Sequence, residues 1–290
     1  MTKWAWQRQD LAACRELPKL NRVNRVGGKE NLMPFSMALI TGASSGIGAA
    51  FARALPRHTG LLLTGRDHLQ LAALSDELAL HGREIKTVLA DLTTVEGRRA
   101  VITLAAAAKV DLIINNAGLG RLGRVIDNVA ERESDMVLVN ILAPVEITRA
   151  LLPDMLARAQ ESNRRCGAIF VASTAAFMPI PYFATYAASK AFLLHYTEAL
   201  AEELSREPID ILALCPGATQ TQFFRRAGAD RLSFSVLHSA ERVAQEGLRM
   251  LGQRRVHVVG PANYMTSLVS RFLPRGLVTF AAERVMREWK

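Results

Sequence analysis

Seven short apolar runs, separated by longer stretches with helical spacing, follow one another from residue 36 to residue 260. The runs are SMALIT, LLLTG, IKTVLAD, VDLIINNAG, CGAIFVAS, IDILALCPG and RVHVVG. An order of strand, helix, strand, helix predicts a parallel sheet with helices on both faces. Apolar residues at nearly every strand position agree with this prediction, because the strands of such a sheet are buried on both sides. After the fourth run, a long helical pattern is expected to reach about Arg158.

The composition agrees with one α/β domain. Half of the 290 residues are hydrophobic, enough for a large core. The three cysteines, Cys14, Cys166 and Cys215, are far apart, which favours neither a disulfide framework nor a metal site, so we expect no metal. No apolar run reaches the ~18 residues of a membrane span, and the N-terminus lacks the apolar core of a signal peptide. A cytoplasmic location is therefore expected.

The net charge of +9 is concentrated at the two ends of the chain. Residues 1–30 hold seven Lys or Arg against three acidic residues, and residues 241–290 hold nine against four. No nucleic-acid-binding motif accompanies this charge, so we expect solvated surface charge and no nucleic-acid partner.

The pattern of apolar residues divides the chain into three parts. Residues 1–35 show no apolar period and are expected to be a poorly ordered N-terminal extension, with a docked arm as the alternative. Residues 36–261 form the predicted α/β domain. Residues 262–290 mix apolar residues and arginines at helical spacing around Pro274, which predicts an amphipathic basic extension. This extension is expected to cover the active site, to pack on another subunit or to lie on an anionic membrane surface, in that order of preference.

The sequence TGASSGIG, residues 41–48, lies between the first predicted strand and the first predicted helix. In a doubly wound sheet this turn holds a dinucleotide pyrophosphate, because the helix N-terminus offers free N–H groups and the positive end of its dipole. Gly42, Gly46 and Gly48 allow close approach of the backbone, and Ser44 and Ser45 add hydroxyl donors. The glycine spacing differs from GxGxxG, and alone it is equally compatible with a tight structural loop. Together with the strand order, it predicts a Rossmann-type sheet of about seven strands.

Five further features follow in order: NNAG at 115–118, Asn140, Ser173 after a strand, YAASK at 186–190 and PG at 216–217. With these features the sequence from about residue 36 to residue 260 resembles the short-chain dehydrogenases/reductases. The resemblance implies a nicotinamide-dependent oxidoreductase, and a homodimer or homotetramer is expected.

The predicted catalytic residues are Asn140, Ser173, Tyr186 and Lys190. Tyr186 and Lys190 are four positions apart on one face of a helix, so the lysine ammonium is expected to lower the pKa of the tyrosine. Ser173 ends a strand, where its hydroxyl can hydrogen-bond a substrate carbonyl. The family resemblance implies that Tyr186 donates the proton, Ser173 polarises the carbonyl, Lys190 also holds the nicotinamide ribose and Asn140 holds a water in a proton relay. Asn140 is equally compatible with a polar residue packed inside a helix.

The choice of nicotinamide cofactor depends on the end of the second strand. NAD sites place a carboxylate there for the ribose 2′-hydroxyl, whereas a 2′-phosphate requires arginine. In family register this position is Gly65, followed by Arg66, so NADP(H) is favoured over NAD(H), although Asp67 leaves NAD open. Asp91 resembles the residue that binds adenine, with a helix N-cap as the alternative. The full set of expected cofactor-binding residues is Gly42, Ser44, Ser45, Gly46, Ile47, Gly48, Arg66, Asp91, Leu92, Asn116, Ala117, Gly118, Tyr186, Lys190, Pro216, Gly217, Thr219 and Thr221.

Two segments near the expected site are rich in apolar side chains. They predict an apolar substrate cavity lined by Phe177, Met178, Ile180, Phe183, Phe223 and Phe224, with ordinary core contacts as the alternative. Arg225 and Arg226 are expected on a solvated face, with contact to a phosphorylated carrier such as an acyl-carrier protein or coenzyme A as the alternative. We therefore predict NADPH-dependent reduction of an apolar ketone or 3-oxoacyl compound to a secondary alcohol. The alternatives are NAD-linked alcohol oxidation, and a non-catalytic dinucleotide sensor or scaffold.

Overall fold

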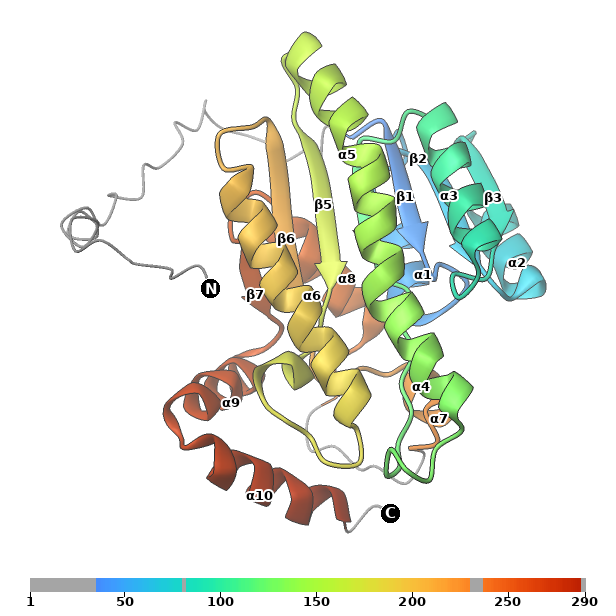
Figure 1. The fold of residues 1–290 in the computed structure, drawn as a ribbon. Coiled ribbons are helices and arrows are strands. Elements are labelled where there is room, and N and C mark those ends of the chain that lie inside the picture. The colour runs from blue at the N-terminus through green and yellow to red at the C-terminus, as the bar shows by residue number, and fades with distance from the viewer. Residues whose placement is uncertain (1–34, 80–81, 230–236, 288–290) are drawn as a thin grey trace, which may run out of the picture. The chain divides into compact units, whose positions relative to one another are not determined.

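The computed structural model describes residues 35–79, 82–229 and 237–287. Its centre is one sheet of seven parallel strands in the order β3-β2-β1-β4-β5-β6-β7 (Figure 1). The strands are β1 (Met37–Thr41), β2 (Gly60–Gly65), β3 (Ile85–Leu89), β4 (Leu112–Asn115), β5 (Cys166–Val171), β6 (Ile209–Cys215) and β7 (Val256–Val258). Each lies within or overlaps one of the seven apolar runs, which confirms the predicted Rossmann-type sheet.

Helices cover both faces of the sheet, in front of it and behind it in Figure 1. One face packs against α1 (Gly46–Ala54), α2 (His68–Ala79) and α8 (Ala240–Met250). The other face packs against α3 (Val95–Ala107), α5 (Ala143–Glu161) and α6 (Ala184–Glu203). Alternate residues of β1 belong to the two hydrophobic cores. Ala38 and Ile40 belong to the core formed with α1, α2 and α8, and Met37 and Leu39 belong to the core formed with α3, α5 and α6. All four are at most 5% exposed, which explains why β1 is apolar at every one of these positions.

The long helical pattern after β4 is interrupted. A loop precedes α4 (Ala130–Val137), and the π-helical turn η3 (Leu138–Leu142) joins α4 to α5. The continuous helical stretch Ala130–Glu161 is long and apolar enough to span a membrane by length and composition. Half of its most apolar part is buried inside the protein, as in the core helix of a soluble fold. We therefore read it as a core helix of the second face.

The ends of the described chain differ from the expected boundaries. Phe35, assigned to the extension from the sequence, is 3% exposed in the core, and its carbonyl accepts a hydrogen bond from Thr59. The rest of the predicted N-terminal extension lies outside the described residues. At the other end, α9 (Pro261–Phe272) and α10 (Arg275–Arg287) meet at Pro274 and lie at the carboxyl end of the sheet (Figure 1).

Strand order places the site. The chain runs outward from β1 through β2 to β3 and then returns to pair β4 with the other side of β1. The strand order therefore reverses between β1 and β4. In open parallel sheets ligands bind beyond the carboxyl ends of the strands at such a point.

Candidate active site

A cavity of about 1160 Å³ opens at the carboxyl ends of the strands. It is large enough for both a dinucleotide and a small substrate. Of the predicted catalytic and cofactor residues, all but Gly48 and Asn140 line it. Within the described ranges, no group of three or more His, Cys, Asp or Glu side chains converges to hold a metal ion.

The glycine turn between β1 and α1 is shaped for close approach of a ligand. Gly42 and Gly46 have φ values of +66° and +57°, which residues other than glycine rarely adopt. Gly48 faces inward instead; a Cβ there would lie 2.3 Å from the carbonyl oxygen of Gly42, so this glycine lets the helix pack against the turn. Ser45, the N-cap of α1, makes no side-chain capping bond, which leaves the first N–H groups of the helix for an anion.

The NNAG segment braces this turn from β4. The hydroxyl of Thr41 accepts hydrogen bonds of 3.0 Å from the backbone N–H groups of both Asn116 and Ala117. The side-chain amide of Asn116 donates to the carbonyls of Thr41 (2.9 Å) and Gly42 (3.2 Å). These bonds fix the end of β1 relative to β4, and Ala117 and Gly118 continue along the cavity wall.

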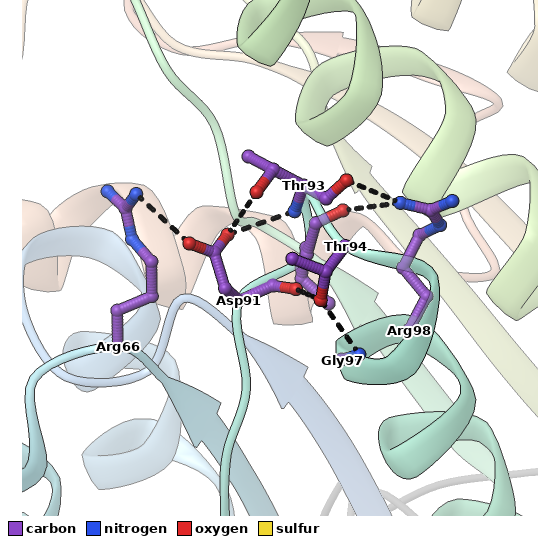
Figure 2. Close-up of polar contacts among 7 residues, drawn as sticks. Arg66, Asp91, Thr93, Thr94, Gly97 and Arg98 are labelled. Atoms are coloured by element: carbon purple, nitrogen blue, oxygen red, sulfur yellow. Dashed lines mark hydrogen bonds and ion pairs between the residues drawn. The ribbon is translucent and has the colours of Figure 1, made fainter.

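Arg66, which follows β2, and Asp91, which follows β3, face each other where both line the cavity (Figure 2). The guanidinium of Arg66 lies 4.0 Å from the carboxylate of Asp91, and both side chains are about half exposed. Burial acts to raise the pKa of Asp91, but hydrogen bonds from Thr93 and the charge of Arg66 outweigh it and hold this pKa below its usual value. The N-cap of α3 is Thr94, whose hydroxyl accepts from Gly97, so Asp91 is not the helix cap itself.

Asp67, whose carboxylate kept NAD as an alternative cofactor in the sequence analysis, is hydrogen-bonded to a nearby residue. Its two carboxylate oxygens accept hydrogen bonds from the backbone N–H of Gln70 (3.0 Å) and from the Gln70 side chain (2.6 Å). Asp67 thus caps the start of α2, because its carboxylate accepts from the N–H of the third helical residue. The carboxylate of Asp67 is therefore engaged at the helix, although the residue still lines the cavity.

Three predicted catalytic side chains converge at the inner end of the cavity. Ser173 follows β5 and precedes the short helix η4 (Thr174–Phe177). Its hydroxyl accepts a 3.1 Å hydrogen bond from the N–H of Ala175 and lies near enough to the hydroxyl of Tyr186 on α6 to influence the pKa of that tyrosine. Lys190, one turn later on α6, donates a 2.8 Å hydrogen bond from Nζ to the carbonyl of Val171, and this Nζ lies 5.8 Å from the centre of the Tyr186 ring. Tyr186 and Lys190 are 8% and 4% exposed, so both act in a largely dry environment.

Burial determines the ionisation of these groups. It raises the pKa of Tyr186 to about 12, and the hydrogen bond with Ser173 opposes the rise only in part. The pKa of Tyr186 therefore lies above the ordinary tyrosine value and not below it, as the sequence led us to expect, because desolvation of the phenolate dominates. Burial also lowers the pKa of Lys190 to about 8. At neutral pH the tyrosine is a protonated donor and the lysine an ammonium that loses its charge easily.

Asn140 lies in the π-helical turn, is 1% exposed and does not line the cavity. Its side-chain oxygen accepts from the N–H of Leu119 (2.8 Å), and its amide donates to the Leu119 carbonyl (2.9 Å) and to the Ser189 hydroxyl (2.9 Å). Asn140 thus ties the loop after β4 to the helix that carries Tyr186 and Lys190. This arrangement resembles the packed polar residue that the sequence left as the alternative, and the role in a water relay stays a prediction.

The segment after β6 closes the cavity over the glycine turn. The Pro216 carbonyl accepts from the Thr174 N–H (2.9 Å), and the Thr219 hydroxyl donates to the Gly217 carbonyl (3.0 Å). The Thr221 side chain lies against Gly46, where a Cβ would approach it to 3.0 Å. The short helix α7 (Phe223–Arg226) follows, and both Thr219 and Thr221 line the cavity.

Arg226 is exposed, as expected from the sequence, and it also lines the cavity. Its guanidinium donates to the Ser45 hydroxyl on the glycine turn (3.3 Å) and to the Gln222 side chain (3.0 Å). Its neighbour Arg225 does not line the cavity. No spacing rule pointed to Arg226, because the contact joins residues 181 positions apart in the chain.

Five of the six apolar side chains expected at the cavity line it: Met178, Ile180, Phe183, Phe223 and Phe224. Met136 and Met286 line it as well and were not expected, as do the charged side chains of Arg121 and Arg132. Phe177 was expected here but lies elsewhere. The guanidinium carbon of Arg271 lies 5.2 Å from the centre of the Phe177 ring, and the ring packs against a separate buried cluster that includes Ala172.

The C-terminal helices contribute to the same cavity. Asn263, Thr266 and Ser267 of α9 and Met286 of α10 line it. The Tyr182 hydroxyl, on the segment before α6, donates a 3.1 Å hydrogen bond to Glu283 of α10. Residues 261–287 therefore cover part of the site, in agreement with the first placement expected for this extension.

Comparisons with known proteins agree with this site. A family model described as short chain dehydrogenase matches residues 36–232. A 1-deoxy-11-beta-hydroxypentalenate dehydrogenase of Streptomyces avermitilis is 33% identical over 246 residues, which cover 82% of this chain and 88% of that protein. Two solved structures are similar in fold. A Sphingobium yanoikuyae short-chain dehydrogenase in complex with NADPH has a TM-score of 0.69 and 30% sequence identity, and the match covers 81% of this chain and 92% of that one. A Burkholderia phymatum short-chain dehydrogenase/reductase in complex with NAD has a TM-score of 0.70 and 25% identity, and the match covers 80% of this chain and 92% of that one. The chain therefore belongs to the short-chain dehydrogenase family and is an NAD(P)-dependent dehydrogenase/reductase.

Proposed function

We propose that the protein reduces the carbonyl group of an apolar ketone or 3-oxoacyl compound to a secondary alcohol with NADPH, and that Tyr186 is the proton donor. One observation carries the proposal. Ser173 and Tyr186, whose side chains lie close together, line the same cavity as the glycine turn. A protein that only bound a dinucleotide would not need this pair.

The cavity residues fit a bound dinucleotide. The uncapped start of α1 accepts the pyrophosphate, and Arg226 adds a positive charge beside Ser45 on the same turn. When bound, the nicotinamide supplies the hydride. Tyr186, kept protonated by its raised pKa, hydrogen-bonds the substrate carbonyl and gives up its proton as negative charge develops on that oxygen. Ser173 donates a second hydrogen bond to the same oxygen.

Lys190 supports the proton donor through charge. Its ammonium lies on the same helix face as Tyr186 and stabilises the phenolate left after proton transfer. Because its pKa is already lowered to about 8, the ammonium is poised to pass on a proton at mildly basic pH. The reverse reaction, alcohol oxidation, uses the same groups with the tyrosine as base.

Three residues at the end of β2 support a preference for NADP(H). Gly65 supplies no carboxylate for a ribose 2′-hydroxyl, and the Asp67 carboxylate is held by Gln70. Arg66 extends at the cavity rim with a guanidinium that is half exposed and fits a 2′-phosphate. The structural relatives named above carry NADPH in one case and NAD in the other, so the preference rests on these three residues.

A panel of carbonyl compounds tests the proposal. Ketones of increasing apolar bulk and 3-oxoacyl thioesters are incubated with NADPH and with NADH in parallel, and loss of reduced-nicotinamide absorbance is followed. We expect turnover that rises with apolar bulk and a higher kcat/KM with NADPH. Tight NADPH binding without turnover of any carbonyl or alcohol would favour a dinucleotide sensor. Faster turnover with NADH would contradict the assignment of Arg66.

A further inference from the structure

Exposed apolar side chains are concentrated on the two C-terminal helices. Of the seventeen large apolar side chains exposed in the described ranges, eight lie between Tyr264 and Val285. Phe272, at the corner between α9 and α10, has the largest exposure of the set at 81%. Scattered single apolar residues are normal on a surface, but a cluster of this density marks an interaction site.

On α9 these side chains follow helical spacing. Met265, Val269 and Phe272 occur at positions i, i+4 and i+7, which places them on one face of the helix. The opposite face is already in contact with the protein: Ser267 is 4% exposed, and the amide of Asn263 donates to the Val259 carbonyl. The apolar face of α9 therefore points away from the protein.

The helix α10 has the same division. Its inner face carries Val278, which is 9% exposed, Glu283, which is bonded to Tyr182, and Met286, which lines the cavity. Leu277 and Phe280, about 60% exposed, lie on the outer face. The contacts of the inner face hold α10 in place, so the outer face is a preformed surface.

Positively charged side chains accompany this apolar surface. Residues 261–287 contain four arginines against one acidic residue, Glu283. Arg271 lies over the ring of Phe177 and Arg287 is paired with Glu283, so Arg275 and Arg284 are the two that supply charge to the outer surface. The guanidinium of Arg284 lies 5.2 Å from the centre of the Phe280 ring, on the outer face of α10. An amphipathic helix with aromatic residues on its apolar face and arginines beside them is typical of attachment to an anionic lipid surface.

We propose that the outer surface of α9 and α10, formed by Met265, Val269, Phe272, Leu273, Leu277 and Phe280 with Arg275 and Arg284, binds the surface of an anionic lipid bilayer. Charge argues against a second copy of the chain as the partner. A two-fold interface would bring Arg275 and Arg284 of both copies together, while Glu283, the one acidic residue of this segment, is already paired with Arg287. Phosphate headgroups supply the missing negative charge, and the acyl region accepts the apolar side chains.

This attachment would place the cavity beside the lipid. Residues of α9 and α10 line the cavity from inside while their outer faces bind the bilayer. An apolar substrate dissolved in the membrane would then reach the site without crossing water, an advantage that rests on the proposed function. Lipid binding itself does not depend on that function.

Flotation of the full-length protein with lipid vesicles tests the proposal. Vesicles of phosphatidylcholine containing about one-third phosphatidylglycerol are compared with pure phosphatidylcholine vesicles at low salt. The test variant is Phe272→Ser/Phe280→Ser, and the matched control is Leu89→Ser/Val95→Ser, which removes two exposed apolar side chains at β3 and α3. The charge variant is Arg275→Gln/Arg284→Gln. Melting curves and size-exclusion chromatography with light scattering accompany all four proteins.

We expect the wild type and the control to bind the anionic vesicles and the Phe272→Ser/Phe280→Ser variant to bind at least about tenfold more weakly. The charge variant should lose about fivefold in affinity for each arginine on anionic vesicles, and its loss should shrink at high salt. Absence of wild-type binding, or equal binding by the Phe272→Ser/Phe280→Ser variant and the control, would overturn the proposal. A wild-type oligomer that dissociates only in the Phe272→Ser/Phe280→Ser variant would assign the surface to another copy of the chain.

Discussion

The guanidinium of Arg226 donates a 3.3 Å hydrogen bond to the hydroxyl of Ser45, so the segment after β6 contacts the glycine turn after β1. Both side chains line the cavity. A cation at this turn complements the pyrophosphate, which NAD and NADP share. Arg66, which follows β2, is proposed to contact only the 2′-phosphate. The two arginines therefore predict different patterns of cofactor affinity.

Substitution of Arg226 should weaken both cofactors alike. We expect Arg226→Ala to reduce the binding free energy of NADPH and of NADH by about 1.5 to 3 kcal/mol each, the usual contribution of a charge-assisted hydrogen bond. Calorimetric titration measures both affinities. Arg225→Ala is the control, because this neighbour does not line the cavity and should bind both cofactors as the wild type does. Unchanged affinity in Arg226→Ala would remove this residue from the cofactor site.

Substitution of Arg66 should instead discriminate between the cofactors. Arg66→Ala is expected to weaken NADPH binding by about 1.5 to 3 kcal/mol and to leave NADH binding nearly unchanged, because only NADPH carries the 2′-phosphate. The same titrations measure the effect. Equal losses for the two cofactors would show that Arg66 does not contact the 2′-phosphate.

Removal of the Tyr186 hydroxyl should separate binding from chemistry. We expect Tyr186→Phe to bind NADPH like the wild type and to lose about 10²-fold or more in kcat, because the proton donor is absent. Tyr196→Phe on the same helix, whose ring packs edge-on against Phe170, is the control and should keep its turnover. Retention of a tenth or more of wild-type turnover by Tyr186→Phe would refute the assignment.

The lowered pKa of Lys190 predicts a dependence of stability on pH. Between about pH 8 and the ordinary lysine value of 10.5, the unfolded chain holds a proton on this residue that the folded protein has released. The free energy of unfolding of the wild type relative to Lys190→Met should therefore rise with pH across this window, by about 3 kcal/mol at most. Urea unfolding at a series of pH values measures it. A difference that falls with pH would show that Lys190 is stabilised in its charged form.

The sheet and the positions lining the cavity were predictable because they depend on local signals. Unbroken apolar runs such as that of β1 reflect burial on both faces, and the glycine turn with its following helix has a strong spacing signature. The carboxyl ends of parallel strands must gather at one edge, so Ser173 and Asn116 had to lie near Gly42.

The features that the sequence did not predict depend on contacts between distant segments. Arg226 reaches Ser45 only because of how α7 folds over the turn, and Phe177 leaves the cavity because Arg271 of α9 covers its ring. The pKa of Tyr186 depends on burial by the surrounding side chains, which the spacing of Tyr186 and Lys190 does not reveal. Spacing thus identifies which residues share a helix face, while their environment is set by the whole fold.

The return of the chain from β3 to β4 has a consequence for how the protein folds. The Thr41 hydroxyl obtains its two partners, Asn116 and Ala117, across 75 and 76 positions of sequence, so the glycine turn is braced only after β4 has docked on β1. Contacts this distant form slowly, because a long loop must close before they are made. A nascent chain that has folded only β1 to β3 has no dinucleotide site. The dinucleotide therefore binds only molecules in which β4 has paired with β1. Added dinucleotide should stabilise these molecules during refolding and so suppress aggregation.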